Sequence, residues 1–131
     1  MTLKVLRYLN RLGPEHHALI DELVEQFWDG TTTEQVLREF GTEQIAAWST
    51  GSGLVLTQIV SHPRGLELFL YGVVGEDTLS RAEDIVSDLR EIAATLRCKM
   101  IGAWGVRNGW DPVTRLLGFR RVATRYMMEI D

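Results

Sequence analysis

The sequence predicts a mixed α/β domain of the α+β kind, in which a mostly antiparallel sheet carries helices on both faces. Three strand-like runs, at 44–50, 53–62 and 66–74, are separated only by short turns, and strands joined in this way pair antiparallel. A long amphipathic helix at 79–97 then precedes a strand-like run at 99–104, and a helix between two strands of one sheet normally makes them parallel neighbours. The predicted order of elements is β-α-α-β-β-β-α-β-α-β.

The N-terminal part of the chain predicts one short strand and two helices. The strand covers 3–9, where polar and apolar residues alternate imperfectly. The first helix covers 13–28, and its apolar stripe consists of Leu19, Ile20, Leu23, Val24 and Phe27. The second helix covers 30–40 and begins at a capping box formed by Thr31 and Glu34.

Glycine-containing turns and a strong helical period define the middle of the chain. Residues 51–53 and 63–65 each contain a turn glycine and separate the three strands. The helix at 79–97 has about five turns and begins at a capping box of Ser80 and Glu83. Its apolar face consists of Leu79, Ala82, Ile85, Val86, Leu89, Ile92, Ala93 and Leu96.

The chain is predicted to close with a short helix, DPVTRLL, and a strand, FRRVATRYMMEI. Asp111 suits the N-cap and Pro112 the first helical position, so the start of this helix is well marked. Gly118 suits the residue that ends the helix, after which Phe119 enters the core. This explanation of the Leu-Gly-Phe sequence requires no catalysis.

Composition and charge exclude several classes of protein. The 131 residues predict one domain over 1–131. The net charge is −4, with seven Lys/Arg against fifteen Asp/Glu in 1–96 (−8) and seven against three in 97–131 (+4). Overall acidity argues against nucleic acid as a partner. The basic residues of 97–131 are expected to pair with an acidic partner or with the acidic helices of the same domain.

Other sequence features argue against disulfides, metals and membranes. The single cysteine, Cys98, excludes an internal disulfide and is interpreted as a buried thiol. His16 and His17 are adjacent, so they point in different directions, and no cysteine or acidic cluster completes a metal site. No apolar run approaches the roughly 20 residues that span a bilayer, and we expect no signal peptide.

In its order of elements and in the segment RNGWDPVTRLLGFRR, the chain resembles the GNAT fold of N-acetyltransferases. In that family the segment before the last strand commonly ends in Leu-Gly-Phe, which here is Leu117-Gly118-Phe119. The compact size, this ending and the strand pair SHPRGLELFLYGVV more narrowly resemble small GNAT-like proteins that tailed bacteriophages encode. The resemblance covers nearly the whole chain in topology and implies a GNAT-like sheet.

The resemblance also implies a site for the pyrophosphate of acetyl-CoA between the strand at 66–74 and the helix after it. The family uses Gln/Arg-x-x-Gly-x-Gly/Ala there, since glycines let backbone N–H groups approach the phosphates at a helix start. This chain has VVGEDTLSRAED, where Glu76 and Asp77 stabilise the helix start and repel a pyrophosphate. The candidate cofactor ligands carried over are Val73, Val74, Gly75, Ser80, Arg81 and Asn108.

Candidate acid and base groups follow from the same resemblance. The family often has a tyrosine four residues before the glycine of Leu-Gly-Phe, which protonates the leaving thiolate. Here that position is Thr114, whose hydroxyl is too weak an acid, so Tyr126 and Tyr71 are the candidate substitutes, with core packing as the alternative. Glu67 is the candidate general base, acting through water, and the alternative is a charge that faces solvent. His62 is interpreted as a turn residue.

Two hypotheses follow for the function. The favoured one is a GNAT-fold protein without efficient acetyl transfer, which binds protein partners as an accessory or virion-associated phage component in the host cytoplasm or the virion. Those partners are other virion proteins or a second copy of the chain. The alternative is an acetyl-CoA-dependent N-acetyltransferase, in which Arg81 and the amides of 76–80 hold the cofactor. Trp28 and Trp110 lie at element edges and are candidate interface anchors or core residues.

Overall fold

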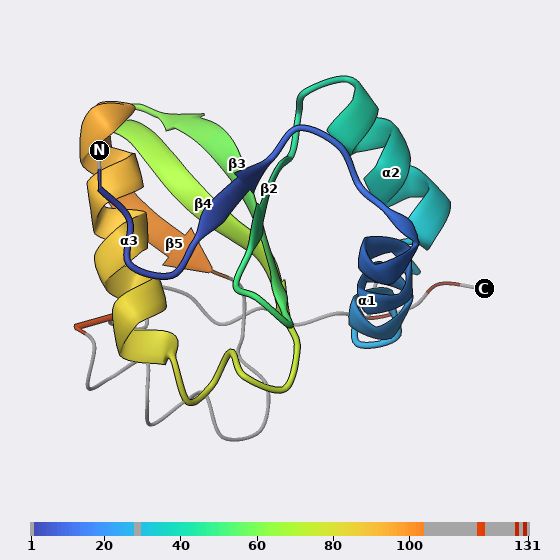
Figure 1. Cartoon of the computed structure of the whole chain (residues 1–131). Coiled ribbons are helices and arrows are strands. Elements are labelled where there is room, and N and C mark those ends of the chain that lie inside the picture. The colour runs from blue at the N-terminus through green and yellow to red at the C-terminus, as the bar shows by residue number, and fades with distance from the viewer. Residues whose placement is uncertain (1, 28–29, 104–117, 120–127, 129, 131) are drawn as a thin grey trace.

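The computed structural model describes residues 2–27, 30–103, 118, 119, 128 and 130. Within them the chain forms three helices and a five-stranded sheet (Figure 1). In chain order the elements are β1 (Arg7–Leu9), α1 (Pro14–Val24), α2 (Thr33–Gly41), β2 (Ala46–Ser49), β3 (Leu54–His62), β4 (Gly65–Val74), α3 (Ala82–Thr95) and β5 (Cys98–Ala103).

The sheet has the mixed topology that the sequence predicts. Its strands lie in the order β1-β2-β3-β4-β5, where the first four are antiparallel neighbours and β5 runs parallel to β4. The two predicted turns contain Gly51 (φ +107°) and Gly65 (φ +128°), conformations that glycine adopts at little cost. The helix predicted at 111–117 and almost all of the strand predicted at 119–130 lie outside the described residues.

Two clusters of buried side chains lie on opposite faces of the sheet, which confirms the predicted placement of helices on both faces (Figure 1). The α3 cluster contains Val5, Leu6, Trp48, Val55, Leu68, Ile85, Leu89, Ile92 and Ala93. The α1–α2 cluster contains Ile20, Leu23, Val36, Ile45, Ala47, Leu54, Leu56 and Val74. Both faces are thus removed from water, which is the main stabilising contribution in such a layered domain.

The first strand is shorter than predicted, because it begins at Arg7 and not at residue 3. The N–H groups of Lys4, Val5 and Leu6 donate to the carboxylate of Asp88 on α3 at 2.8, 2.7 and 2.8 Å, so they bond to a side chain and not to a neighbouring strand. Burial raises the pKa of the Asp88 carboxyl, but these backbone N–H groups outweigh burial and hold the pKa below its ordinary value.

The capping box predicted for α2 is wrong by one residue. Thr32 and Gln35 form it in place of Thr31 and Glu34. The N–H of Gln35 donates to Oγ1 of Thr32 at 3.2 Å, and the N–H of Thr32 donates to Oε1 of Gln35 at 2.9 Å. Three consecutive threonines make the local sequence compatible with either start.

The capping box predicted at Ser80 for α3 is also wrong, because the helix begins only at Ala82. The hydroxyl of Ser80 donates to the carbonyl oxygen of Asp77 at 3.0 Å, as part of a series of turns. The shorter helix also corrects two predicted core residues. Leu79 and Leu96 lie outside the helix ends and are 41% and 47% exposed.

Alternation along β4, up to a bulge at Tyr71, sets which side chains face α1. Tyr71 is the extra residue of β4 relative to β3. Leu68 and Leu70 pack in the α3 cluster, whereas Tyr71 packs in the α1–α2 cluster. Because successive strand residues alternate between faces, Glu67 lies on the same face as α1 and α2.

Candidate functional site

The candidate cofactor site is the loop of residues 75–81, which joins β4 to α3 and packs against the turn between β2 and β3. Gly75 has a φ of +123°, and a side chain on it would collide with the Cα atom of Gly53 in that turn. Thr78 is buried, and its hydroxyl donates to the carbonyl oxygen of Gly75 at 2.8 Å. The loop is therefore a series of turns that lies directly against the sheet.

Three side chains bind the loop to the turn, and we call Thr50, Asp77 and Arg81 the loop latch. The hydroxyl of Thr50 donates to the carboxylate of Asp77 at 3.1 Å and accepts the N–H of Gly53 at 2.9 Å. The guanidinium of Arg81 donates to the carbonyl oxygen of Thr50 at 2.6 Å and to the carboxylate of Asp77 at 3.3 Å. The Thr50 hydroxyl, the Asp77 carboxylate and Nη1 of Arg81 thus bond to one another or to the backbone beside them.

The carboxylate of Asp77 is ionised at neutral pH. Burial raises its pKa, but hydrogen bonds from Ser52, Thr50 and Arg81 outweigh burial and hold the pKa below its ordinary value. The carboxylate of Asp77 is therefore an anion already bound to Arg81, the one arginine that the resemblance assigns to the cofactor.

The loop latch does not fit a bound pyrophosphate. An anion of this kind needs converging backbone N–H groups and an available cation. Here Nη1 of Arg81 is already bonded to a carbonyl oxygen and to the carboxylate of Asp77, and that carboxylate repels a phosphate that approaches the arginine. The residues present in the described loop are therefore poorly matched to the group that the fold family would place there.

The other candidate cofactor ligands are distributed around this loop. Val74 is fully buried in the α1–α2 cluster, and Val73 packs against the α3 cluster, so both side chains serve the core. Ser80 is exposed, with its hydroxyl turned to Asp77. Asn108 lies outside the described residues. Their role as ligands stays a prediction.

Glu67, the candidate general base, is held by groups on both neighbouring strands. One carboxylate oxygen pairs with Nε2 of His62, the last residue of β3, and the other lies where a side chain on Gly102 of β5 would be. The Glu67 side chain is only 16% exposed. The carboxylate is therefore held against the sheet and does not extend into solvent, and its catalytic role stays a prediction.

Tyr71, a candidate substitute for the missing acid, packs against α1. Its ring meets that of Phe27 edge to face, with centroids 5.7 Å apart and planes at 82°. The residue is half-buried, as expected for a packing role. Thr114 and Tyr126 lie outside the described residues.

Sequence reasoning missed the pairing of Thr50 with Asp77, since 27 residues separate them and neither belongs to a recognised motif. Two glycines in the sequence, Gly53 and Gly75, are the feature that could have indicated this pairing, because glycine is favoured where two backbones approach closely. Among the described residues, no three His, Cys, Asp or Glu side chains are close enough to hold a metal. None of the helices described is long and apolar enough to cross a membrane.

Comparisons with known proteins identify the fold. No protein-family model and no curated protein matches the chain. An acetyltransferase from Trypanosoma brucei superposes with a TM-score of 0.66 at 19% identity, covering 95% of this chain and 98% of that one. Aminoglycoside N-acetyltransferase AAC(6')-Iy in complex with CoA gives 0.59 at 12% identity over 99% of each chain. A transcriptional regulator from Bacillus halodurans gives 0.63 at 11% identity, covering 95% and 99%. The chain therefore has the GNAT-like fold of these solved structures.

Proposed function

We propose that the protein carries out no efficient acetyl transfer and acts by binding another protein. The observation that carries this proposal is the loop latch, in which the backbone carbonyl of Thr50 and the carboxylate of Asp77 both accept from Nη1 of Arg81. A pyrophosphate entering the loop displaces these bonds and meets two carboxylates, of Glu76 and Asp77. The fold by itself does not decide the activity, since function resides in the site.

A second candidate is an N-acetyltransferase with a divergent cofactor loop, and one observation favours it. The carboxylate of Glu67 is largely removed from water and is paired with the imidazole of His62, a position suited to a base that accepts a proton through water. Among the similar structures, AAC(6')-Iy was solved in complex with CoA. On this alternative, backbone amides of 76–80 hold acetyl-CoA after the latch opens.

Binding of acetyl-CoA to the purified chain separates the two candidates. We expect no change in the unfolding temperature at about millimolar acetyl-CoA, because a ligand stabilises the native state only to the extent that it binds it. A ligand present at a hundredfold excess over its Kd stabilises by about 2.7 kcal/mol, which a thermal-shift assay resolves as several degrees. Stabilisation of this size refutes the proposal and supports the enzyme.

The loop latch offers a sharper version of the same experiment. Asp77→Asn removes the anion and keeps the shape of the side chain, whereas Glu76→Gln changes an exposed neighbour. If the latch excludes the cofactor, acetyl-CoA stabilises Asp77→Asn more than either wild type or Glu76→Gln. Equal responses of all three show that the carboxylate of Asp77 is irrelevant to cofactor binding.

The place of action is a separate part of the proposal. We infer a virion or the host cytoplasm only from the resemblance to small phage-encoded GNAT-like proteins. A gene that lies between genes for virion structure supports this inference, and detection of the protein in purified virions by mass spectrometry tests it directly.

A further inference from the structure

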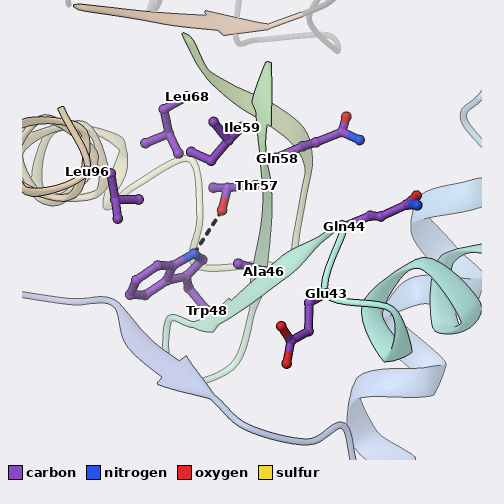
Figure 2. Close-up of a pocket in the computed structure, with 9 residues that line it drawn as sticks. All are labelled: Glu43, Gln44, Ala46, Trp48, Thr57, Gln58, Ile59, Leu68 and Leu96. Carbon is purple, nitrogen blue, oxygen red and sulfur yellow. Dashed lines mark hydrogen bonds between the residues drawn. The ribbon is translucent and has the colours of Figure 1, made fainter. Parts of the chain in front are cut away.

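A pocket of about 260 Å³ lies on the α3 face of the sheet, beyond the C-terminal end of α3 (Figure 2). Its lining residues are Glu43, Gln44, Ala46, Trp48, Thr57, Gln58, Ile59, Leu68 and Leu96. The α3 helix separates it from the loop latch, because α3 has 14 residues and is therefore about 21 Å long. The pocket is thus distinct from the candidate cofactor site.

The pocket has an apolar interior. Trp48 and Leu68 are 6% and 1% exposed, and the indole Nε1 of Trp48 donates to the hydroxyl of Thr57 at 3.0 Å. Since the polar atom of the indole is bonded inside the protein, Trp48 has no donor left for a ligand. Figure 2 shows Leu68, Ile59 and Leu96 together on one side of the pocket.

Two of the apolar residues that line the pocket are partly exposed, and an exposed tyrosine lies on the neighbouring strand. Ile59 and Leu96 are 44% and 47% exposed. Tyr8 on the neighbouring strand β1 is 60% exposed and meets Trp48 edge to face, with centroids 5.2 Å apart. Contiguous exposed apolar side chains around a concave site are typical of interaction surfaces, and Trp and Tyr are enriched among their energetically important residues.

Size and charge indicate what occupies the pocket. Its volume lies just below the roughly 300–1,000 Å³ of sites for drug-sized ligands, and it suits one large side chain better than a nucleotide cofactor. Glu43 is the only charged residue among the nine that line it, and its side chain is exposed. Figure 2 shows the side chains of Gln44 and Gln58 pointing away from Leu68 and Leu96, so their amide groups do not face the apolar interior.

We propose that this pocket docks a segment of a protein partner that inserts one large apolar side chain and places a lysine or arginine beside Glu43. The inference rests on the proposed function, that the protein acts by binding another protein, and it names the surface and the chemistry of that partner. The apolar insertion supplies the affinity, and the carboxylate selects the charge of the flanking residue.

Short capped peptides test the proposal on the full chain. The probes are Gly-Lys-Trp-Lys-Gly, the charge-reversed Gly-Glu-Trp-Glu-Gly, and Gly-Lys-Ala-Lys-Gly, which lacks the large side chain. Nuclear magnetic resonance of the ¹⁵N-labelled protein follows the indole N–H signal of Trp48, assigned through its loss in Trp48→Phe. We expect the first peptide to shift this signal at about millimolar concentration, the second to bind at least threefold more weakly, and the third to have no effect.

Rim variants show whether the pocket itself is responsible. Leu96→Glu places a charge on the apolar rim and weakens the binding of the first peptide at least tenfold. Leu79→Glu is the matched control, because Leu79 is similarly exposed but lies at the opposite end of α3. Glu43→Lys reverses the preference in favour of the glutamate-flanked peptide. All three positions are exposed, so folding is retained, and far-UV circular dichroism verifies this.

The outcomes separate this inference from the proposed function. A chain that acetyl-CoA stabilises refutes the proposed function, whatever the peptides do. A chain that acetyl-CoA leaves unchanged, and whose Trp48 signal no peptide moves, refutes the docking site alone. Equal weakening by Leu96→Glu and Leu79→Glu, or an unchanged charge preference in Glu43→Lys, likewise overturns the proposed site.

Discussion

Replacing Asp88 by alanine has the largest effect on stability that we expect of any single polar side chain in the described core. The carboxylate is 1% exposed and accepts three backbone N–H groups from the N-terminal segment at 2.7–2.8 Å. Each hydrogen bond to a charged group contributes about 1.5–3 kcal/mol, but three that share one carboxylate are not additive. Asp88→Ala leaves these backbone N–H groups without their acceptor, at about 1–3 kcal/mol for each that stays unsatisfied, so the expected total effect is about 3–5 kcal/mol.

Urea unfolding followed by circular dichroism at neutral pH measures this loss. Domains of this size have a free energy of unfolding of about 5–15 kcal/mol. Asp88→Ala therefore moves the midpoint of unfolding to a much lower urea concentration. Asp84→Ala is the control, because Asp84 is exposed on the same helix and its contribution is below about 1 kcal/mol. An Asp88→Ala protein within about 1 kcal/mol of wild type refutes the view that this carboxylate holds the N-terminal segment.

The same carboxylate predicts the pH dependence of stability. The pKa of Asp88 is below its ordinary value in the folded chain, so in acid the unfolded chain binds more protons. Its contribution is therefore complete above the unfolded pKa of about 3.9 and is lost as the pH falls through the lower, folded pKa. The difference in unfolding free energy between wild type and Asp88→Asn should be constant down to about pH 5 and shrink below about pH 4. A difference that persists unchanged into stronger acid contradicts the assignment.

Two glycines allow further predictions from close approach. Gly75→Ala lowers the free energy of unfolding in urea by at least about 2 kcal/mol, because φ is +123° and the new methyl group meets Gly53. Gly41→Ala in α2 is the control. The new methyl group there meets open space, so the free energy of unfolding stays the same or rises by up to about 1 kcal/mol. Gly102→Ala displaces the Glu67 carboxylate from the imidazole of His62, so the nuclear magnetic resonance signals of that imidazole change position. Unchanged imidazole signals in that variant contradict the contact.

Regular elements of this protein follow from local patterns. The strands predicted at 53–62 and 66–74 agree with β3 and β4 to within one residue at each end. The parallel pairing of β4 with β5 follows from the helix between them. Such features depend on the spacing of apolar residues within one helix or strand. That spacing can be read from a short stretch of the sequence.

Element boundaries and the state of the candidate site depend on contacts between distant parts of the chain. Asp88 takes the N–H groups that strand 3–9 would otherwise use, more than 80 residues away. Thr50 and Asp77 close the loop from which the resemblance predicted cofactor ligands, and Glu67 is positioned by His62 and Gly102 from the strands on either side of it.

The order of the helices and strands that the structure describes, and the absence of a glycine-rich cofactor loop, are therefore properties of the sequence read locally. The closure of that loop by its own arginine and aspartate, and the apolar pocket at the other end of α3, arise only in the folded chain. The physical reason is that hydrogen bonds and apolar contacts act over a few ångströms in space, while the residues that make them are tens of positions apart in sequence.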